Sequence, residues 1–204
     1  MGIKRYIAGY IESVVNQIQY KKHQEKQLAY LNAATFDPES VRLDNTVQIF
    51  NNRGDKKYIS IGNNSWIKGE LLTWKHGGEI SIGENCFIGD FAKIWSSVKV
   101  SIGNNVLISH GVNIHDNISH PLNSIERHQD FLHVRKIGLQ DNVNISEAEI
   151  IIEDDAWVGF NATIFKGVTV GKGAIIGANT VITKDVPPFA VVVGNPARII
   201  KQTT

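Results

Sequence analysis

Five of the seven histidines in this chain lie between positions 110 and 133: His110, His115, His120, His128 and His133. An imidazole with an ordinary pKa of about 6.5 can take a proton from a hydroxyl group at neutral pH, so the cluster suggests general-base chemistry. Taken singly, a histidine is more often a surface or hydrogen-bonding residue. His120 is the strongest candidate because Pro121 follows it, and a histidine at the root of a loop with a rigid neighbour can be held over a groove.

The elements that must position these histidines follow a six-residue rhythm. Aliphatic residues recur at this step at Ile152, Val158, Ile164, Val170, Ile176 and Ile182. A period of six fits neither an α-helix nor a single long strand, and short fixed repeats are typical of solenoids. The pattern predicts a parallel β-helix in which three hexads make one turn and each aliphatic residue points into a narrow core. A β-sandwich is the alternative, but it would not hold so strict a register over so many units.

The same rhythm occurs earlier in the chain, at Ile82, Ile88, Ile94, Ile102, Ile108 and Ile114. The step of eight between Ile94 and Ile102 implies two extra residues at one corner. Between Ile114 and Ile152 the rhythm lapses, which predicts one long inserted loop over residues 118–149. Solenoids carry insertions as surface loops, often on the binding side, so we expect the chemistry there.

The rest of the chain divides around this β-helix of residues 59–186. Residues 1–34 are predicted to form an amphipathic helix, with apolar residues at helical spacing at Ile3, Tyr6, Ile7, Tyr10, Ile11, Val14, Val15 and Ile18. This apolar stripe is expected either to pack against the chain's own β-helix or a sister subunit, or to lie on a membrane surface as a peripheral contact. Packing is favoured because the polar face is not densely basic. Residues 35–58 form an irregular leading segment, and residues 187–204 form a C-terminal tail.

Composition narrows the function classes. A chain of 204 residues with 42% hydrophobic residues is long enough for one domain with a sizeable core. Its formal net charge of +1 gives no electrostatic case for nucleic acid. The single cysteine excludes a disulfide framework and a cysteine-based zinc site. Without a secretory signal or a membrane span, we expect a cytoplasmic protein.

Three stretches carry a resemblance to a known family: SHPLNSIER from Ser119, DDAWVGFNATI from Asp154, and GANTVITKDVPPFAVVVGNPARIIK from Gly177. With the coil pattern, they resemble the hexapeptide-repeat acetyltransferases, a likeness that spans residues 59–201. The nearest branch is similar to the sugar O-acetyltransferases, including the maltose, galactoside, lipopolysaccharide and capsule enzymes. The resemblance implies an all-β, left-handed parallel β-helix and a homotrimer. It also implies acetyl-CoA in the groove between subunits, a sugar or glycan acceptor and no metal.

The resemblance also implies roles for individual residues. His120 matches the general base of direct acetyl transfer, and the cofactor site comprises Trp157, Gly177, Ala178, Thr183, Lys184 and Arg198. Small residues suit the amide-rich pantetheine arm, and the cations of Lys184 and Arg198 suit the 3′-phosphate. The alternative for both cations is a solvated surface on the last coil.

Two further positions are predicted to contact the acceptor. Asp90 occupies the family's acceptor-contacting position, and His115 follows Ile114 in a slot that glycine takes elsewhere, so it should point outward. We also expect a carboxylate or a carbonyl to orient the imidazole of His120, with Glu126 and Glu147 as the candidate carboxylates. The long loop and the N-terminal helix favour enzymes of surface polysaccharide or lipopolysaccharide biosynthesis.

Three alternatives stay open. The acceptor group can be an amine, which would make the protein an amino-sugar N-acetyltransferase. A γ-carbonic-anhydrase-like metal hydratase would use His110 and His115, with His76 as a third ligand. A non-catalytic trimeric scaffold is the last alternative, and the retained His120 and Lys184 argue against it.

Overall fold

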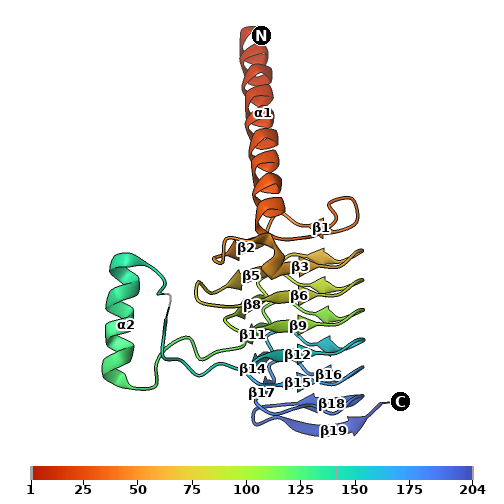
Figure 1. Ribbon diagram of the computed structural model, residues 1–204. Coiled ribbons are helices and arrows are strands. Elements are labelled where there is room, and N and C mark those ends of the chain that lie inside the picture. The colour runs from red at the N-terminus through yellow and green to blue at the C-terminus, as the bar shows by residue number, and fades with distance from the viewer. Residues whose placement is uncertain (1, 141, 204) are drawn as a thin grey trace.

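The computed structural model describes residues 2–140 and 142–203. A long N-terminal helix, α1 (Gly2–Ala33), leads into a stack of short strands that runs from Arg42 to Gln202 (Figure 1). A second helix, α2 (Ser124–Ile137), interrupts the stack and stands beside it. A short 3-10 turn, η1 (Lys56–Tyr58), precedes the third strand.

The strands form three sheets, and up to β18 consecutive strands belong to different sheets. The eight-stranded sheet contains, in order, β1 (Arg42–Leu43), β4 (Trp66–Ile67), β7 (Phe87–Ile88), β10 (Leu107–Ile108), β13 (Trp157–Val158), β16 (Ile175–Ile176), β18 (Ala190–Val193) and β19 (Arg198–Gln202). The six-stranded sheet contains β2 (Gln48–Asn51), β5 (Glu70–Thr73), β8 (Lys93–Ser96), β11 (Asn113–His115), β14 (Thr163–Phe165) and β17 (Val181–Ile182). The five-stranded sheet contains β3 (Ile59–Ile61), β6 (Ile80–Ile82), β9 (Val100–Ile102), β12 (Ile150–Ile152) and β15 (Thr169–Val170).

From β1 to β14, each strand pairs in parallel with the strand three places further along the chain, as β4 does with β7 and β7 with β10. The chain therefore visits each sheet once per turn, and the prediction of three hexads per turn is confirmed. We call this stack of turns the coil.

The predicted aliphatic positions form the core of the coil. Ile88, Ile94 and Ile102, one from each sheet, are almost fully buried. A second inward position, two residues earlier, holds alanine in some turns, such as Ala92 and Ala162, and a larger residue in the five-stranded sheet, such as Ile80 and Ile150. Fully burying an isoleucine side chain contributes roughly 1.5–3 kcal/mol, so the repeated column supplies most of the stabilisation of the coil.

One edge of the coil is built from turns that need a left-handed backbone. Asn64, Asn85, Asn105 and Asp155 have φ between 57° and 64°. Asparagine and aspartate tolerate this conformation better than other side-chain-bearing residues. Their side chains also connect successive turns, since Asn85 Nδ2 donates to Asn105 Oδ1 at 3.3 Å and Asn105 Nδ2 to Asp155 Oδ1 at 3.0 Å.

Both ends of the coil extend further than the sequence rhythm indicates. The leading segment of residues 35–58 contains β1 and β2, which pair in parallel with β4 and β5, so strand pairing starts at Arg42. The C-terminal tail of residues 187–204 contains β18, parallel to β16, and β19, antiparallel to β18. A cis Asn195–Pro196 bond lies between them. These strands have irregular spacing, which explains why a search for hexads does not find them.

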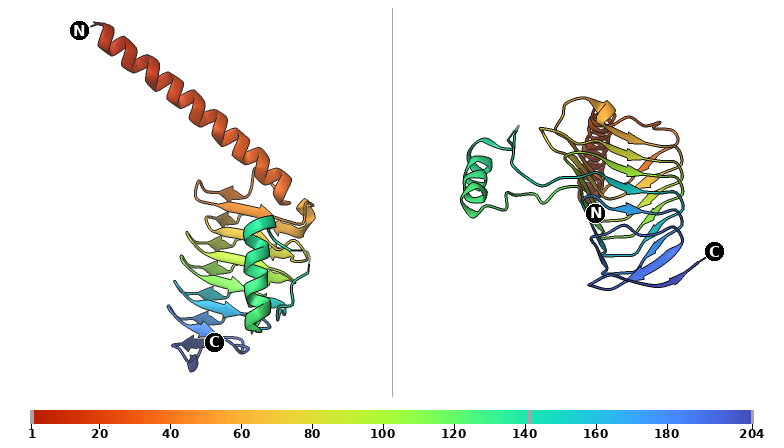
Figure 2. Two further views of the ribbon diagram at one scale, coloured as in Figure 1. Left: turned by 90° about the vertical axis from the view of Figure 1, so that its left-hand side faces the viewer. Right: turned by 60° about the horizontal axis from the view of Figure 1, so that its bottom comes forward.

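The inserted segment of residues 118–149 is not a simple loop, which corrects the prediction for its middle part. The side chain of Asn123 caps the start of α2 by accepting from the backbone N–H groups of Ile125 and Glu126. Gly138, with φ of 104°, ends the helix. The two flanking stretches hold α2 away from the three sheets (Figure 1; Figure 2, right). We call residues 116–149 the arm.

Helix α1 projects from the first turn of the coil (Figure 1; Figure 2, left). Its last turns contact the coil through Tyr30 Oη, which donates to the Val47 carbonyl at 2.7 Å, and through Lys26 Nζ and the Asn45 carbonyl at 2.6 Å. The side chains of Ile3, Tyr6 and Ile7 lie outside the described part. The other apolar side chains of the stripe, Val14 excepted, are exposed, so the predicted packing on the chain's own coil is limited to the last turns. Neither α1 nor α2, as described, has the length and apolar character to cross a membrane.

Candidate active site

His120 lies on the arm, a few residues after the end of β11. Ser119 takes a left-handed backbone with φ of 64°, and the His120 N–H donates to the Ile118 carbonyl at 2.7 Å. The ring Nδ1 lies 3.1 Å from Asp130 Oδ2, and the His120 side chain is 55% exposed. When Nδ1–H donates to this carboxylate, Nε2 keeps its lone pair. This is the tautomer that a general base requires.

Asp130 is the acid that orients the imidazole. It is the buried residue of α2, with a side chain 7% exposed, and its other oxygen, Oδ1, accepts from Gln140 Nε2 at 2.9 Å. The expectation of Glu126 or Glu147 in this role is wrong. Glu126 accepts from Asn144, and Glu147 pairs with His76 at 3.2 Å.

A signal for this helix was present in the sequence. Asn123 before Glu126 and Gly138 after Lys136 are typical start and stop residues of a helix. The lapse of the six-residue rhythm predicts only a loop in this region, so it gives no helix face on which Asp130 could be placed. Even with the helix in place, the pairing of Asp130 with His120 depends on how α2 folds back along the arm.

Polar side chains surround a hollow of about 380 Å³ between α2 and the returning stretch of the arm. Asp130 lies on its wall together with Gln129, His133, Asn142 and Asn144. Amide, acid and imidazole groups of this kind form hydrogen bonds with hydroxyl groups. The hollow can therefore hold a hydroxyl-rich molecule beside the His120–Asp130 pair.

His115 points outward, as expected, but it does not occupy a glycine corner slot. It ends β11, where the strand register aligns it with Trp95 and Phe165. Its ring stacks on Trp95 with centroids 4.7 Å apart and an angle of 16°. Burial, and secondly the nearby Lys93, lowers the pKa of His115, so the neutral ring is favoured.

The three histidines considered for a metal site have separate partners. His76 pairs with Glu147, His110 stacks on Phe160 at 5.3 Å, and His115 stacks on Trp95. Among the described residues, no three histidine, cysteine, aspartate or glutamate side chains come together to hold a metal ion.

Trp157 lies on the outer surface of the eight-stranded sheet. It begins β13, is 49% exposed, and its Nε1 lies 3.4 Å from Ser109 Oγ. The register aligns it with Leu107 on one side and Ile175 on the other. An exposed indole in an apolar column is a suitable wall for a flat or flexible ligand.

Gly177 and Ala178 follow β16 at the corner between the eight- and six-stranded sheets. The N–H of Gly177 donates to the Val192 carbonyl at 2.8 Å, and a Cβ added there would lie 2.7 Å from Val193 Cγ1. Glycine is therefore required for close packing of β18, and its N–H is already used within the chain. Ala178 is exposed.

Thr183 and Lys184 line a hollow of about 340 Å³ after β17. Asn195 and Pro196, from the turn between β18 and β19, form part of the same wall. Arg198 begins β19 and is exposed. Thr183 and Lys184 therefore share a hollow with the segment that leads to Arg198, while Arg198 itself is not among the residues that line it.

Asp90 lies at the corner between β7 and β8. It pairs with Lys68 Nζ at 2.5 Å and accepts from Thr46 Oγ1 at 3.1 Å. The hydrogen bond from Lys68 lowers the pKa of Asp90. The carboxylate is therefore held in its charged form by residues of its own chain.

These groups do not meet within one chain. His120 is bonded to α2, which stands off the coil, whereas Trp157 and Ala178 lie on the coil itself (Figures 1 and 2). One chain thus carries the His120–Asp130 pair on its arm and Trp157, Thr183 and Lys184 on its coil.

Comparison with known proteins also distinguishes the coil from the arm. The family model of the hexapeptide repeat of succinyl-transferase matches residues 79–116 and 149–184, and the gap between the matches falls on the arm. Galactoside O-acetyltransferase of Escherichia coli (strain K12) is 30% identical over 71% of this chain and 64% of its own length. This chain thus spans somewhat less than two thirds of that relative.

Two solved structures are similar over larger shares of their chains. The polySia specific acetyltransferase NeuO is 32% identical, with a TM-score of 0.61 over 79% of this chain and 68% of its own. A hexapeptide-repeat containing acetyltransferase from Vibrio cholerae is 31% identical, with a TM-score of 0.57 over 71% of this chain and 73% of its own. The chain belongs to the hexapeptide-repeat acetyltransferases.

Proposed function

We propose that this chain transfers the acetyl group of acetyl-CoA to a hydroxyl group of a sugar in surface polysaccharide or lipopolysaccharide biosynthesis. The observation that carries the proposal is the His120–Asp130 pair, a half-exposed imidazole held by a buried carboxylate at 3.1 Å. The printed names of two relatives, a galactoside O-acetyltransferase and a polySia specific acetyltransferase, support a sugar acceptor.

The proposed chemistry is direct transfer. Nε2 of His120 takes the hydroxyl proton while the acceptor oxygen forms a bond to the thioester carbon. The carbon–sulfur bond then breaks, and the imidazolium returns its proton to the leaving CoA thiolate. Asp130 holds the ring in the required tautomer and stabilises the imidazolium, and no acyl-enzyme is needed.

The coil residues are proposed to hold acetyl-CoA. Trp157 would lie along the pantetheine arm, and the cations of Lys184 and Arg198 would pair with phosphate. Because the N–H of Gly177 already donates to Val192, its backbone contact with pantetheine would be through its carbonyl, with Ala178 beside it. Thr183 lines the same hollow as Lys184 and would contact the adenosine end.

We infer a left-handed coil and a homotrimer. The outer surfaces of two sheets carry different apolar columns: Trp66, Phe87, Leu107 and Trp157 on the eight-stranded sheet, and Leu72, Trp95, His115 and Phe165 on the six-stranded sheet. The five-stranded sheet presents Ser60, Ser81 and Ser101 instead. Two different apolar surfaces favour a head-to-tail contact that closes into a ring, in which one copy's arm reaches the coil of the next. Light scattering that finds a monomer at micromolar concentration would exclude this arrangement.

The acceptor is proposed to lie against the arm. The polar hollow beside Asp130 suits the hydroxyl groups of a glycan, whereas Asp90 is engaged by Lys68 and Thr46 on the coil. Asp90 and His115 would contact the acceptor only where a neighbouring arm brings it to the coil surface.

The test is release of the CoA thiol from acetyl-CoA in the presence of a galactoside, polySia and nucleotide-sugars. We expect turnover with at least one of these acceptors. His120→Ala should lower kcat by about 10²- to 10⁴-fold, the range for lost general-base catalysis, without weakening acetyl-CoA binding. A chain that does not bind acetyl-CoA in calorimetry, or a His120→Ala variant with full activity, would refute the proposal.

A further inference from the structure

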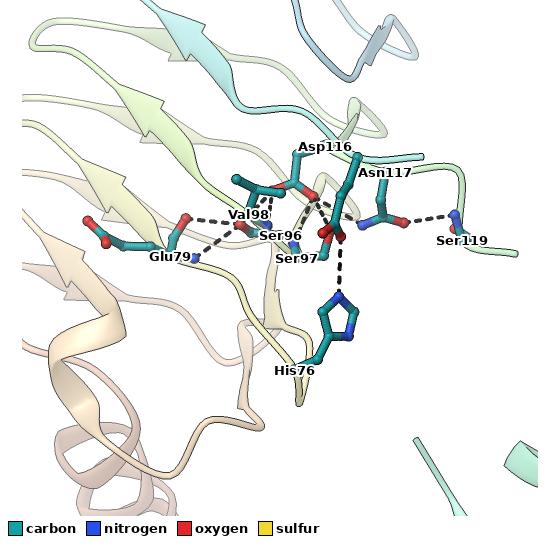
Figure 3. A network of polar contacts seen from close by, with 9 residues as sticks. His76, Glu79, Ser96, Ser97, Val98, Asp116, Asn117 and Ser119 are labelled. Carbon is teal, nitrogen blue, oxygen red and sulfur yellow. Dashed lines mark hydrogen bonds and ion pairs between the residues drawn. The ribbon is translucent and has the colours of Figure 1, made fainter. Parts of the chain in front are cut away.

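A buried carboxylate, Asp116, lies where the arm leaves the coil. It is fully buried, and five groups contact its two oxygens (Figure 3). Oδ1 accepts from the N–H of Ser97 at 2.7 Å, from its Oγ at 3.1 Å, and from Asn117 Nδ2 at 3.1 Å. Oδ2 accepts from Ser96 Oγ at 2.7 Å and from the Val98 N–H at 2.9 Å. Three of these partners are N–H groups, which can only donate, so the site is built for a charged acceptor.

The groups that hold the Asp116 carboxylate form a site that we call the socket. The irregular step of the coil creates it. The interval of eight residues between Ile94 and Ile102 places two extra residues at the corner after β8. There the backbone N–H groups of Ser97 and Val98 both turn toward Asp116 instead of joining a ladder. The socket is tied to the previous turn as well, because Ser96 Oγ, while donating to Asp116, accepts from the N–H of Glu79 at 3.2 Å.

From Asp116, fixed contacts continue toward His120. Asn117 is also buried, and its Oδ1 accepts from the N–H of Ser119 at 2.8 Å. The next N–H, that of His120, donates back to Ile118 at 2.7 Å. Each residue between the socket and the imidazole is therefore held by a hydrogen bond.

The returning stretch of the arm is fixed to the same point. The N–H of Ala148 donates to the Asp116 carbonyl at 2.9 Å, and Asn117 forms an antiparallel bridge with Glu147. The Glu147 side chain pairs with His76 on an earlier turn at 3.2 Å (Figure 3). Asp116 thus lies where both stretches of the arm meet the coil.

We propose that Asp116 is a positioning residue for His120. Its carboxylate fixes the direction in which the arm leaves the coil, and that direction sets where the imidazole stands relative to the thioester. Because His120 stands close to Asp116 along the chain, a shift at the root of the arm also moves the imidazole, and an error of about 1 Å can cost about 10²-fold in rate. The inference rests on the proposed function, in which His120 is the base.

Asp116→Asn tests the proposal with almost no change in size. One oxygen becomes an NH₂ group, which must face an N–H of Ser97 or Val98, so donor meets donor in either orientation. We expect kcat to fall by about tenfold to a hundredfold, while the acetyl-CoA Kd from calorimetry stays unchanged. Asp154→Asn is the matched control. Asp154 accepts from the Asn104 N–H at 2.7 Å at another corner with no connection to the arm, and this variant should keep the wild-type kcat.

A double-mutant cycle with His120→Ala separates positioning from a general effect on folding. If Asp116 acts through His120, Asp116→Asn should not lower the residual rate of His120→Ala any further. A lower melting temperature with unchanged kcat, or an equal loss in both backgrounds, would overturn the proposal. So would a His120→Ala variant with full activity, and acetyl-CoA binding by that variant would show whether the cofactor part of the proposed function still stands.

If Asp116→Asn does not fold, Asn117→Ala provides the same test. It removes the link between Asp116 and the Ser119 N–H and leaves the carboxylate in its socket. The same loss of kcat, absent in the His120→Ala background, is expected. A wild-type kcat for Asn117→Ala in that case would overturn the proposal.

Discussion

Replacing Asp130 with asparagine tests the pair on which the proposed chemistry depends. In the wild type, Oδ2 faces His120 Nδ1 at 3.1 Å and Oδ1 faces Gln140 Nε2 at 2.9 Å. Asparagine keeps one oxygen and replaces the other with a donor. If its oxygen faces His120, Gln140 must turn its own oxygen toward the new NH₂ group. If its NH₂ group faces His120, the ring must accept at Nδ1, and Nε2 then carries the proton and cannot act as a base.

The two orientations predict different rates. With the oxygen toward His120, the hydrogen bond is kept but its acceptor is neutral, which costs about 1–1.5 kcal/mol, the difference between hydrogen bonds to charged and to neutral groups. At 1.36 kcal/mol per decade, kcat should fall by about fivefold to about twelvefold. With the NH₂ group toward His120, the loss should be larger; the same replacement costs serine proteases about 10⁴-fold.

The assay is steady-state release of the CoA thiol with the acceptor found in the screen. Asp154→Asn serves as the matched carboxylate control, because Asp154 accepts from the Asn104 N–H on the coil and lies outside the arm. We expect the Asp130→Asn loss in kcat and unchanged acetyl-CoA affinity. An Asp130→Asn enzyme at the wild-type rate, or an equal loss in Asp154→Asn, would refute the assignment.

Three further predictions concern other parts of the molecule. Lys184→Ala should raise the KM for acetyl-CoA by about tenfold to a hundredfold, the 1.5–3 kcal/mol of a charge-assisted hydrogen bond, whereas dephospho-CoA thioester should be used equally by variant and wild type. A variant that still discriminates like the wild type would exclude the phosphate contact. Deleting residues 2–33 should impair assembly, measured by light scattering, more than acetyl transfer. If assembly persists and vesicle binding is lost, α1 is instead a membrane contact. Burial lowers the pKa of His115, so the unfolded state binds more protons and stability should fall as pH drops below about 6.5. His115→Phe should flatten this dependence in thermal melts between pH 7 and 5, and an unchanged slope would show that His115 does not cause it.

Much of the coil could be predicted because its signal is local and repeated. Each hexad places one aliphatic residue at its core position, so the spacing of Ile88, Ile94 and Ile102 predicts the register of the strands. The ends were harder to predict. β1 and β2 carry no regular hexads, and Arg42 joins the eight-stranded sheet only because Trp66 is available as its partner.

The sequence predicts individual residues of the candidate site but not the contacts between their side chains. His120 was identified from the proline that follows it, and the coil places Thr183 and Lys184 in one hollow, as the resemblance implied. His115 was placed in a corner because the hexad count ignores which sheet a residue belongs to. The register instead stacks it on Trp95.

The sequence by itself determined the three strands per turn and the interruption after Ile114, because these depend on spacing along the chain, and its resemblance to the family offered His120 as the candidate base. Only the tertiary structure decided that Asp130, rather than Glu126 or Glu147, orients His120, and that Asp116 holds the root of the arm. Both contacts join residues whose side chains meet only after α2 folds back and the corner after β8 turns its N–H groups toward Asp116. Hydrogen bonds of this kind depend on direction and distance in space, and no periodic pattern along the chain encodes them.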